Sequence, residues 1–124
     1  MPPPIAPLDG RRILVVEDEY LIAIELKRWL MTAGATVIGP VPSVDQALDL
    51  IEDDTPDGAV LDVNLGDGDT VYEVADKLGA VGVPYLFATG DVKLAETSVY
   101  RHRPRLEKPF VEAELVRALV ELFS

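Results

Sequence analysis

Short apolar runs alternate with amphipathic stretches along most of this 124-residue chain. The apolar runs are rich in Val, Ile and Leu, as expected for strands buried on both faces of a parallel sheet. They predict strands over residues 13–16, 35–41, 57–62, 83–88 and 105–107. Apolar residues at helical spacing predict helices over residues 22–33, 43–52, 70–79 and 115–123. This alternation indicates an α/β fold with a doubly wound parallel sheet.

The predicted helices carry signals at their ends. Gly34 follows the first helix and fits the left-handed position that commonly ends a helix. Ser43 and Thr70 each stand three residues before a Gln or Glu, which is the pattern of a capping box. Residues 91–104 show only weak helical spacing, so the fourth helix of the alternation is expected to be short or irregular.

The stretch from Gly58 to Leu65 is typical of an apolar strand that ends at the carboxylate of Asp62. In an open α/β sheet, ligands bind at the carboxyl ends of the strands. Asp62 is therefore a candidate functional residue, although an aspartate at this place could also simply begin a turn.

The composition of the chain excludes several classes of function. Eleven Lys and Arg stand against 22 Asp and Glu, which gives a formal net charge of −11. This charge argues against binding to nucleic acid or to anionic membrane surfaces. The chain has no cysteine, so disulfides and thiolate metal sites are excluded. No apolar run approaches the roughly 18 residues of a membrane span.

The amino terminus is rich in proline and lacks the features of a signal peptide. We expect residues 1–10 to form a disordered tail and residues 11–124 to form one domain. The expected location is the cytoplasm, and the expected state is a monomer or weak dimer.

Four predicted strand ends carry chemically active side chains, which a parallel sheet would bring to one edge. They are Glu17, Asp18, Asp62, Thr89 and Lys108. Clustered carboxylates repel one another unless a cation joins them, and Mg²⁺ prefers oxygen ligands. Glu17, Asp18 and Asp62 therefore predict a divalent-metal site, to which the backbone carbonyl of Asn64 could add an oxygen.

The remaining two side chains suggest a reaction at Asp62. Lys108 can neutralise an oxyanion, and the Thr89 hydroxyl can donate a hydrogen bond. A metal, an ammonium and a hydroxyl around one carboxylate are what phosphoryl transfer to that carboxylate requires. Each residue alone has an ordinary structural reading, and the signal lies in their joint placement.

From about Arg12 to Phe123 the chain resembles a response-regulator receiver domain (CheY-like). The resemblance rests on four segments in this order: Ile13-Leu14-Val15-Val16-Glu17-Asp18-Glu19, Val60-Leu61-Asp62-Val63-Asn64, Ala88-Thr89-Gly90 and Glu107-Lys108-Pro109-Phe110. It implies a flavodoxin-like five-stranded sheet in the order 2-1-3-4-5. It also implies a cis peptide bond before Pro109.

The resemblance further implies a signalling role rather than an enzyme acting on an external substrate. Asp62 would accept a phosphoryl group from a histidine kinase or histidine phosphotransfer protein, catalyse its own transfer and hydrolysis, and signal to a downstream protein. Mg²⁺ or Mn²⁺ would bind directly to Asp18, Asp62 and the Asn64 carbonyl, with Glu17 assisting through a water. Lys108 would contact the phosphoryl oxygens, and Thr89 would move toward them.

The chain departs from the family pattern in three places. Arg105 stands where receivers usually have an aromatic switch residue, residues 90–104 are poor in helix signals, and Gly66 replaces a common proline. The sequence motifs around Thr89 and Lys108 resemble those of the "FAT GUY" group of stand-alone alphaproteobacterial receivers, which serve in general stress signalling. We expect Thr89, Gly90 and Arg105 to shape the output.

Three alternative functions fit the residues less well. A phosphatase of the haloacid dehalogenase type would place its nucleophile on the first strand in an Asp-x-Asp sequence, whereas Asp62-Val63-Asn64 lacks the second carboxylate. A receiver-like interaction module that is never phosphorylated would not need the full set of metal and oxyanion partners. A flavodoxin would want Gly, Ser and Thr in the loop after Val16, where this chain has carboxylates.

Overall fold

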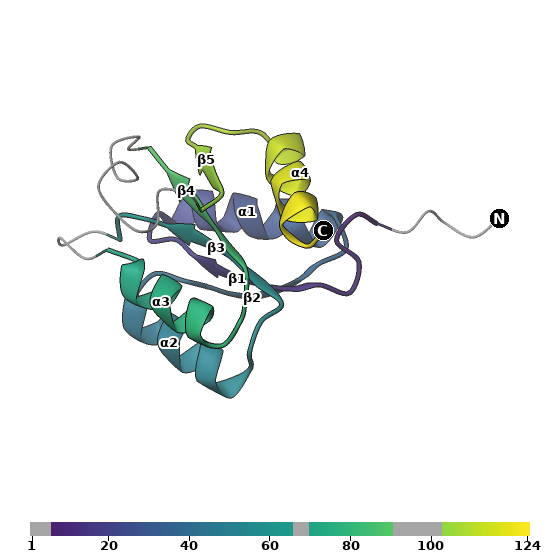
Figure 1. Cartoon of the computed structure of the whole chain (residues 1–124). Helices are drawn as coiled ribbons and strands as arrows, with labels where there is room; N and C mark the ends of the chain where they lie inside the picture. The colour runs from purple at the N-terminus through teal and green to yellow at the C-terminus, as the bar shows by residue number, and fades with distance from the viewer. Residues whose placement is uncertain (1–5, 66–69, 91–102) are drawn as a thin grey trace.

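The computed structural model describes residues 6–65, 70–90 and 103–124 of the chain. Its centre is a five-stranded sheet in the order β2-β1-β3-β4-β5, and every neighbouring pair is parallel. The predicted flavodoxin-like order is therefore confirmed (Figure 1). The strands are β1 (Arg12–Val16), β2 (Thr36–Val41), β3 (Gly58–Asp62), β4 (Tyr85–Thr89) and β5 (Arg105–Glu107).

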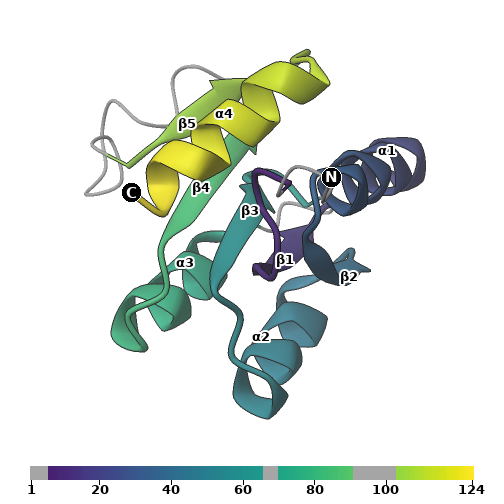
Figure 2. The ribbon, with the colours of Figure 1, turned by 90° about the vertical axis from the view of Figure 1, so that its right-hand side faces the viewer.

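Helices cover both faces of the sheet. They are α1 (Tyr20–Thr32), α2 (Val44–Asp53), α3 (Tyr72–Ala80) and α4 (Glu112–Leu122). Figures 1 and 2 show α2 and α3 on one face of the sheet and α1 and α4 on the other. Within the described part of the chain, no helix has both the length and the apolar character to cross a membrane.

Each face of the sheet has its own apolar core. On β1, Leu14 and Val16 pack into the core beneath α2 and α3, whereas Ile13 and Val15 pack into the core beneath α1 and α4. This division follows from the period of two along a strand. All five residues of β3 are buried, as its apolar run predicted for the middle of the sheet.

The helix ends agree with the sequence in two cases and disagree in one. The Ser43 hydroxyl accepts a hydrogen bond from the Gln46 N–H at 3.3 Å, and Gly34 adopts a left-handed φ of 97°. The capping box predicted at Thr70 is wrong, because the residue before α3 is Val71 and no side chain caps the helix. Thr70 instead forms an antiparallel bridge with Asn64, which takes it away from the helix end.

Residues 6–10 do not form a free tail, so the predicted disorder is wrong for this half of the segment. Leu8 is buried in the core beneath α1 and α4, and its N–H donates to the Ala33 carbonyl at 2.9 Å. Burial of a large aliphatic side chain contributes about 2 kcal/mol, which favours order here. Residues 1–5 of the expected tail lie outside the described residues.

The last residues of the chain pack beside the segment that leads into β1. The Arg11 guanidinium lies 4.3 Å from the centre of the Phe123 ring. The same ring contacts β3 at Gly58, where an added Cβ would lie only 2.7 Å from the ring edge. A side chain at position 58 would therefore displace Phe123, which explains a glycine at the start of the central strand.

Two further expectations concern the loops. The peptide bond before Pro109 is cis, as the resemblance implied, and the bond between Gly39 and Pro40 is also cis. The short or irregular helix expected within residues 91–104 falls mostly on residues 91–102, outside the described residues.

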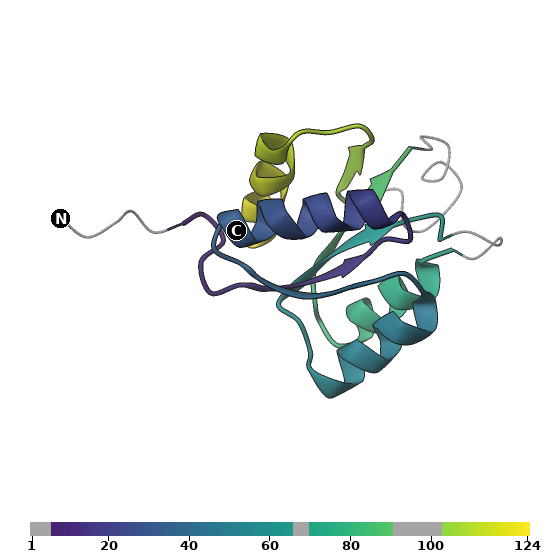
Figure 3. The same cartoon turned by 180° about the vertical axis from the view of Figure 1, so that it is seen from behind.

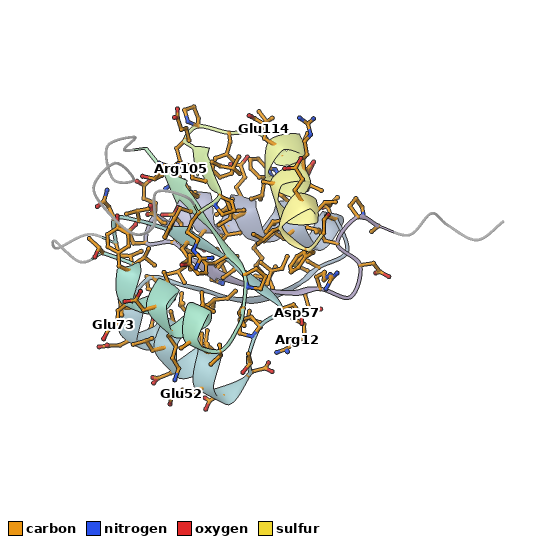
Figure 4. All side chains as sticks on the ribbon, viewed as in Figure 1. Arg12, Glu52, Asp57, Glu73, Arg105 and Glu114 are labelled. Carbon is orange, nitrogen blue, oxygen red and sulfur yellow. The ribbon has the colours of Figure 1, made fainter. Side chains whose placement is uncertain are left out.

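Arg12 organises the end of the sheet where β1 and β3 begin, which we call the amino edge (Arg12, Asp54, Thr55 and Asp57). The Arg12 guanidinium forms an ion pair with Asp54 and donates to the Thr55 carbonyl at 2.9 Å. The Arg12 backbone N–H donates to the Asp57 carboxylate at 2.8 Å. Figure 4 shows the labelled Arg12 and Asp57 side chains close together at this edge.

Candidate functional site

The opposite end of the sheet collects the candidate site residues, and we call it the carboxyl edge (Glu17, Asp18, Asp62, Thr89 and Lys108). Glu17 and Asp18 follow β1, Asp62 and Thr89 are the last residues of β3 and β4, and Lys108 follows β5. The strand register places Asp62 beside Ala88, and the Lys108 N–H donates to the Thr89 carbonyl at 2.8 Å. Parallel pairing thus brings together residues far apart in the sequence.

Three carboxylates meet at this edge. Glu17, Asp18 and Asp62 each offer an oxygen, and these oxygens lie within 4.8 Å of one another. Glu17 and Asp62 are 2% and 7% exposed, whereas Asp18 is exposed. The cluster is therefore open to solvent from the side of Asp18 and enclosed by protein on the side of Glu17.

Lys108 is the ammonium group of this cluster, and its nearest carboxylate is unexpected. Its Nζ lies 2.8 Å from Glu17 Oε1 and 3.4 Å from Asp62 Oδ1. The other oxygen of Glu17 accepts a hydrogen bond from the Glu19 N–H at 3.2 Å. Glu17 was predicted only as a metal ligand, but in this structure it is the closest partner of Lys108.

The ionisation of Asp62 reflects this crowding. Burial, followed by the hydrogen bond and charge of Glu17, raises the pKa of Asp62 to about 8 from its usual 3.8, although Lys108 opposes the shift. Burial lowers the pKa of Lys108, but the hydrogen bond and charge of Glu17, with help from Asp62, outweigh it and raise the pKa. A single ammonium thus does not offset the repulsion among the carboxylates.

The donor set fits a hard divalent cation. All three side chains offer carboxylate oxygens, one of them is solvent-exposed, and Asp62 is hard to ionise without further positive charge. Mg²⁺ and Mn²⁺ bind such oxygen sites while keeping several waters. Asn64 lies two residues after the end of β3, is exposed, and bridges Thr70 through its backbone.

The expected output residues lie on the β4–β5 side of the site. Thr89 is 3% exposed at the end of β4, and the adjacent Gly90 is exposed with open space around its Cα and no left-handed φ. Arg105 is half-buried on β5 opposite Phe87. Figure 4 labels Arg105 at this strand.

An aromatic row beside Arg105 was not predicted. The ring of Phe87 lies 6.0 Å from that of Tyr72 on α3 and 5.5 Å from that of Tyr85. The guanidinium of Arg103 stands 5.1 Å from the centre of the Tyr85 ring. The alternation of Tyr85 and Phe87 along β4 could have indicated these ring contacts. The contact with Arg103 could not be predicted, because it depends on how the segment before β5 lies against β4.

Comparison with known proteins agrees with this geometry. The family model described as the response regulator receiver domain matches residues 13–120. The solution structure of SdrG from Sphingomonas melonis Fr1 has a TM-score of 0.80 and 40% identity, covering 96% of this chain and 99% of that one. A structure of the BeF3-activated conformation of SdrG has a TM-score of 0.78 and 42% identity, covering 91% and 96% of the two chains.

Curated relatives are longer. The transcriptional regulatory protein PdtaR of Mycobacterium tuberculosis is 30% identical over 115 residues, which are 88% of this chain and 55% of PdtaR. The phyllosphere-induced regulator PhyR of Methylorubrum extorquens is 31% identical over 109 residues, which are 83% of this chain and 40% of PhyR. The chain thus spans about half the length of the curated relatives it matches. On the family match and the shared fold, the chain belongs to the response regulator receiver domains, the signalling modules of two-component systems.

Proposed function

We propose that Asp62 accepts a phosphoryl group from a phosphohistidine on a histidine kinase or histidine phosphotransfer protein. The observation that carries this proposal is the position of Asp62 at the end of the central strand. There its carboxylate lies 3.4 Å from the Lys108 ammonium and within 4.8 Å of the oxygens of Glu17 and Asp18. Family membership supports the same assignment.

In the proposed reaction, an Asp62 oxygen forms a bond to phosphorus while the P–N bond to the donor imidazole breaks. The electron pair of that bond stays on the imidazole nitrogen, which takes up a proton from solvent. Lys108 neutralises charge on a phosphoryl oxygen, and the Thr89 hydroxyl donates a hydrogen bond to another. Hydrolysis by water then returns Asp62 to a carboxylate and releases inorganic phosphate. Positioning and charge neutralisation supply most of the catalysis in such transfers.

The site needs extra positive charge because a protonated Asp62 is a poor nucleophile. Asp18 and Asp62 would hold Mg²⁺ or Mn²⁺ directly, with the Asn64 backbone carbonyl as a third oxygen and Glu17 assisting through a water. When bound, the ion favours ionised Asp62 and neutralises the phosphoryl oxygens. Glu17 would keep Lys108 at the edge of the site until the phosphoryl group arrives.

The signal would leave through protein contacts in the cytoplasm, from a monomer or weak dimer that binds a downstream signalling protein and no nucleic acid. Thr89, Gly90 and Arg105 would shape the output together with residues 91–104. The similarity to SdrG, whose chain this one covers almost completely, supports a stand-alone switch or phosphorelay member of the "FAT GUY" group. One similar structure is called the PhyR stress response regulator, which supports a role in stress signalling.

Phosphotransfer profiling tests the proposal. The chain is incubated with Mg²⁺ and radiolabelled phospho-forms of purified histidine kinases, alongside Asp62→Asn and the control Asp49→Asn on the exposed side of α2. We expect acid-stable, base-labile label on the wild type and on the control, and none on Asp62→Asn. Label retained by Asp62→Asn would place the acceptor elsewhere.

The same assay separates the alternatives. Absence of label from every kinase and from small phosphodonors would favour a receiver-like module that is never phosphorylated. Repeated turnover of small phosphomonoesters would favour a phosphatase.

A further inference from the structure

A pair of aromatic rings joins α1 to the segment that follows β5. The Trp29 and Phe110 ring centroids are 6.3 Å apart, and the ring planes are tilted by 59°. Both side chains are partly buried, and both pack against the core beneath α1 and α4. Figure 3 shows α1 and the connection from β5 to α4 on the same side of the sheet. Trp29 is the only tryptophan of the chain.

Phe110 is tied closely to two residues of the carboxyl edge. The Lys108 N–H donates to the Thr89 carbonyl at 2.8 Å, so the backbones at the ends of β4 and β5 are joined at this point. Only Pro109 separates Lys108 from Phe110. A displacement of Lys108 therefore reaches the Phe110 backbone through two peptide units, and a displacement of Thr89 reaches it through the hydrogen bond to Lys108 and the same two units.

The rings have room to respond. A groove of about 210 Å³ runs along them, between α1 and the 108–110 segment. It is lined by Ile22, Glu25, Leu26, Trp29, Lys108, Pro109 and Phe110. Most protein interiors are packed too densely for a side chain to turn without displacing its neighbours. A ring beside an open apolar groove can change its tilt at little cost.

The ion pairs of Lys108 indicate how phosphorylation would displace this residue. The Lys108 ammonium lies closer to Glu17 than to Asp62, at 2.8 Å against 3.4 Å. A phosphoryl group on Asp62 would add negative charge on the Asp62 side and draw the ammonium away from Glu17. The same group would draw the Thr89 hydroxyl. Both displacements act on the one pair of hydrogen-bonded backbones that leads to Phe110.

We propose that the 108–110 segment transmits phosphorylation of Asp62 to α1 through the Phe110–Trp29 contact. This inference rests on the proposed function of Asp62. It gives the switch a second route, on the α1–α4 face of the sheet, in addition to the β4–β5 side where Arg105 replaces an aromatic residue. α1 begins two residues after Asp18 and carries Trp29, so the helix is linked to the site by the chain at its first residue and through Phe110 at Trp29.

The test uses the whole chain with Mg²⁺ and beryllium fluoride as the phosphoryl mimic. Fluorine NMR measures binding of beryllofluoride directly, and the emission of Trp29 measures the response of α1. We expect a saturable shift of the Trp29 emission maximum with the same concentration dependence as the bound fluorine signal. Phe110→Leu should bind beryllofluoride normally but lose most of the emission shift, whereas Phe110→Tyr, which keeps a ring, should retain it.

A matched control removes an aromatic ring from the other face of the sheet. Tyr72→Leu takes away the ring beside Phe87 and should leave the Trp29 response unchanged. Thermal melts establish that each variant is folded, and Phe110→Tyr keeps the test valid if Phe110→Leu is not.

The outcomes separate the two proposals. Bound beryllofluoride with unchanged Trp29 emission would overturn the route to α1 and leave the role of Asp62 intact. A full shift in folded Phe110→Leu would also overturn the route. Failure of the wild type to bind beryllofluoride would overturn the proposed function and the inference together.

Discussion

The two edges of the sheet differ in how well their carboxylates are paired with positive charges and hydrogen-bond donors. At the amino edge, Arg12 makes an ion pair with Asp54 and donates through its backbone N–H to Asp57, so both carboxylates have a donor (Figure 4). At the carboxyl edge, three carboxylates share one ammonium. The first arrangement holds the starts of the strands together, whereas the second leaves negative charge uncompensated.

This difference separates structural charges from functional ones. A folded domain gains nothing in stability from crowding Glu17, Asp18 and Asp62 at one strand edge, because each raises the cost of ionising the others. Perturbed carboxylates of this kind cluster at functional sites, where a ligand supplies the missing charge. The comparison therefore predicts opposite responses when a carboxylate is neutralised at each edge.

The largest expected effect is at the carboxyl edge. Asp62→Asn removes one of the crowded charges, and without divalent metal at pH 8 it should increase the free energy of unfolding by on the order of 1–3 kcal/mol. Urea denaturation in the presence of a chelator measures the change. A destabilised Asp62→Asn would show that the site is not electrostatically strained.

A pH dependence of the same origin should be visible in the wild type. The pKa of Asp62 is about 8 in the fold against an ordinary 3.8, so between these values the folded state binds more protons than the unfolded state. The contribution of Asp62 to stability is therefore lost as the pH rises through this range. We expect the chelated wild type to lose stability between pH 5 and pH 8 relative to Asp62→Asn, by roughly the 1–3 kcal/mol given above. Millimolar Mg²⁺ should remove most of the difference.

Metal binding should distinguish the two acidic residues after β1. Asp18 is exposed, whereas Glu17 is buried against Lys108. Asp18→Ala should weaken Mn²⁺ binding more than Glu17→Gln does, because it removes a direct ligand, whereas Glu17→Gln should cost about tenfold, as loss of an outer-shell partner does. Electron paramagnetic resonance of free Mn²⁺ measures both affinities. Equal losses would mean that Glu17 binds the ion as directly as Asp18 does.

The smallest expected effect is at the amino edge. Asp57→Asn keeps an acceptor for the Arg12 N–H but loses the charge, so we expect a loss of about 0.5–1 kcal/mol of stability. The same urea titration measures it. A gain in stability, as expected at Asp62, would remove the contrast between the edges.

Much of the fold and the membership of the site could be predicted from the sequence. The apolar runs around Val15 and Val60 identified strands because buried parallel strands leave little room for polar residues. In a parallel sheet, the strand ends that carry Asp62, Thr89 and Lys108 lie at one edge, whatever their separation along the chain. Topology, rather than local sequence, brought them together.

The partners within the site could not be predicted. Glu17 and Lys108 are 91 residues apart, and whether the ammonium lies nearer to Glu17 or Asp62 depends on side-chain conformations that no local pattern records. Thr70 had the spacing of a cap, but a backbone bridge to Asn64 competed for it. Leu8 lies close to the prolines that predict a disordered tail. Its side chain is nevertheless buried, and this burial keeps the segment ordered.

The contact between Arg11 and Phe123 places the segment that leads into β1 beside the segment that follows α4. The first and last elements of the domain therefore lie close together. Its order along the polypeptide could be permuted, for example by joining these ends and opening the exposed turn at Gly82, without changing which strands are neighbours. The carboxyl edge depends on those neighbours alone. The site is therefore determined by which strands pair in the sheet and not by the order of the strands along the chain.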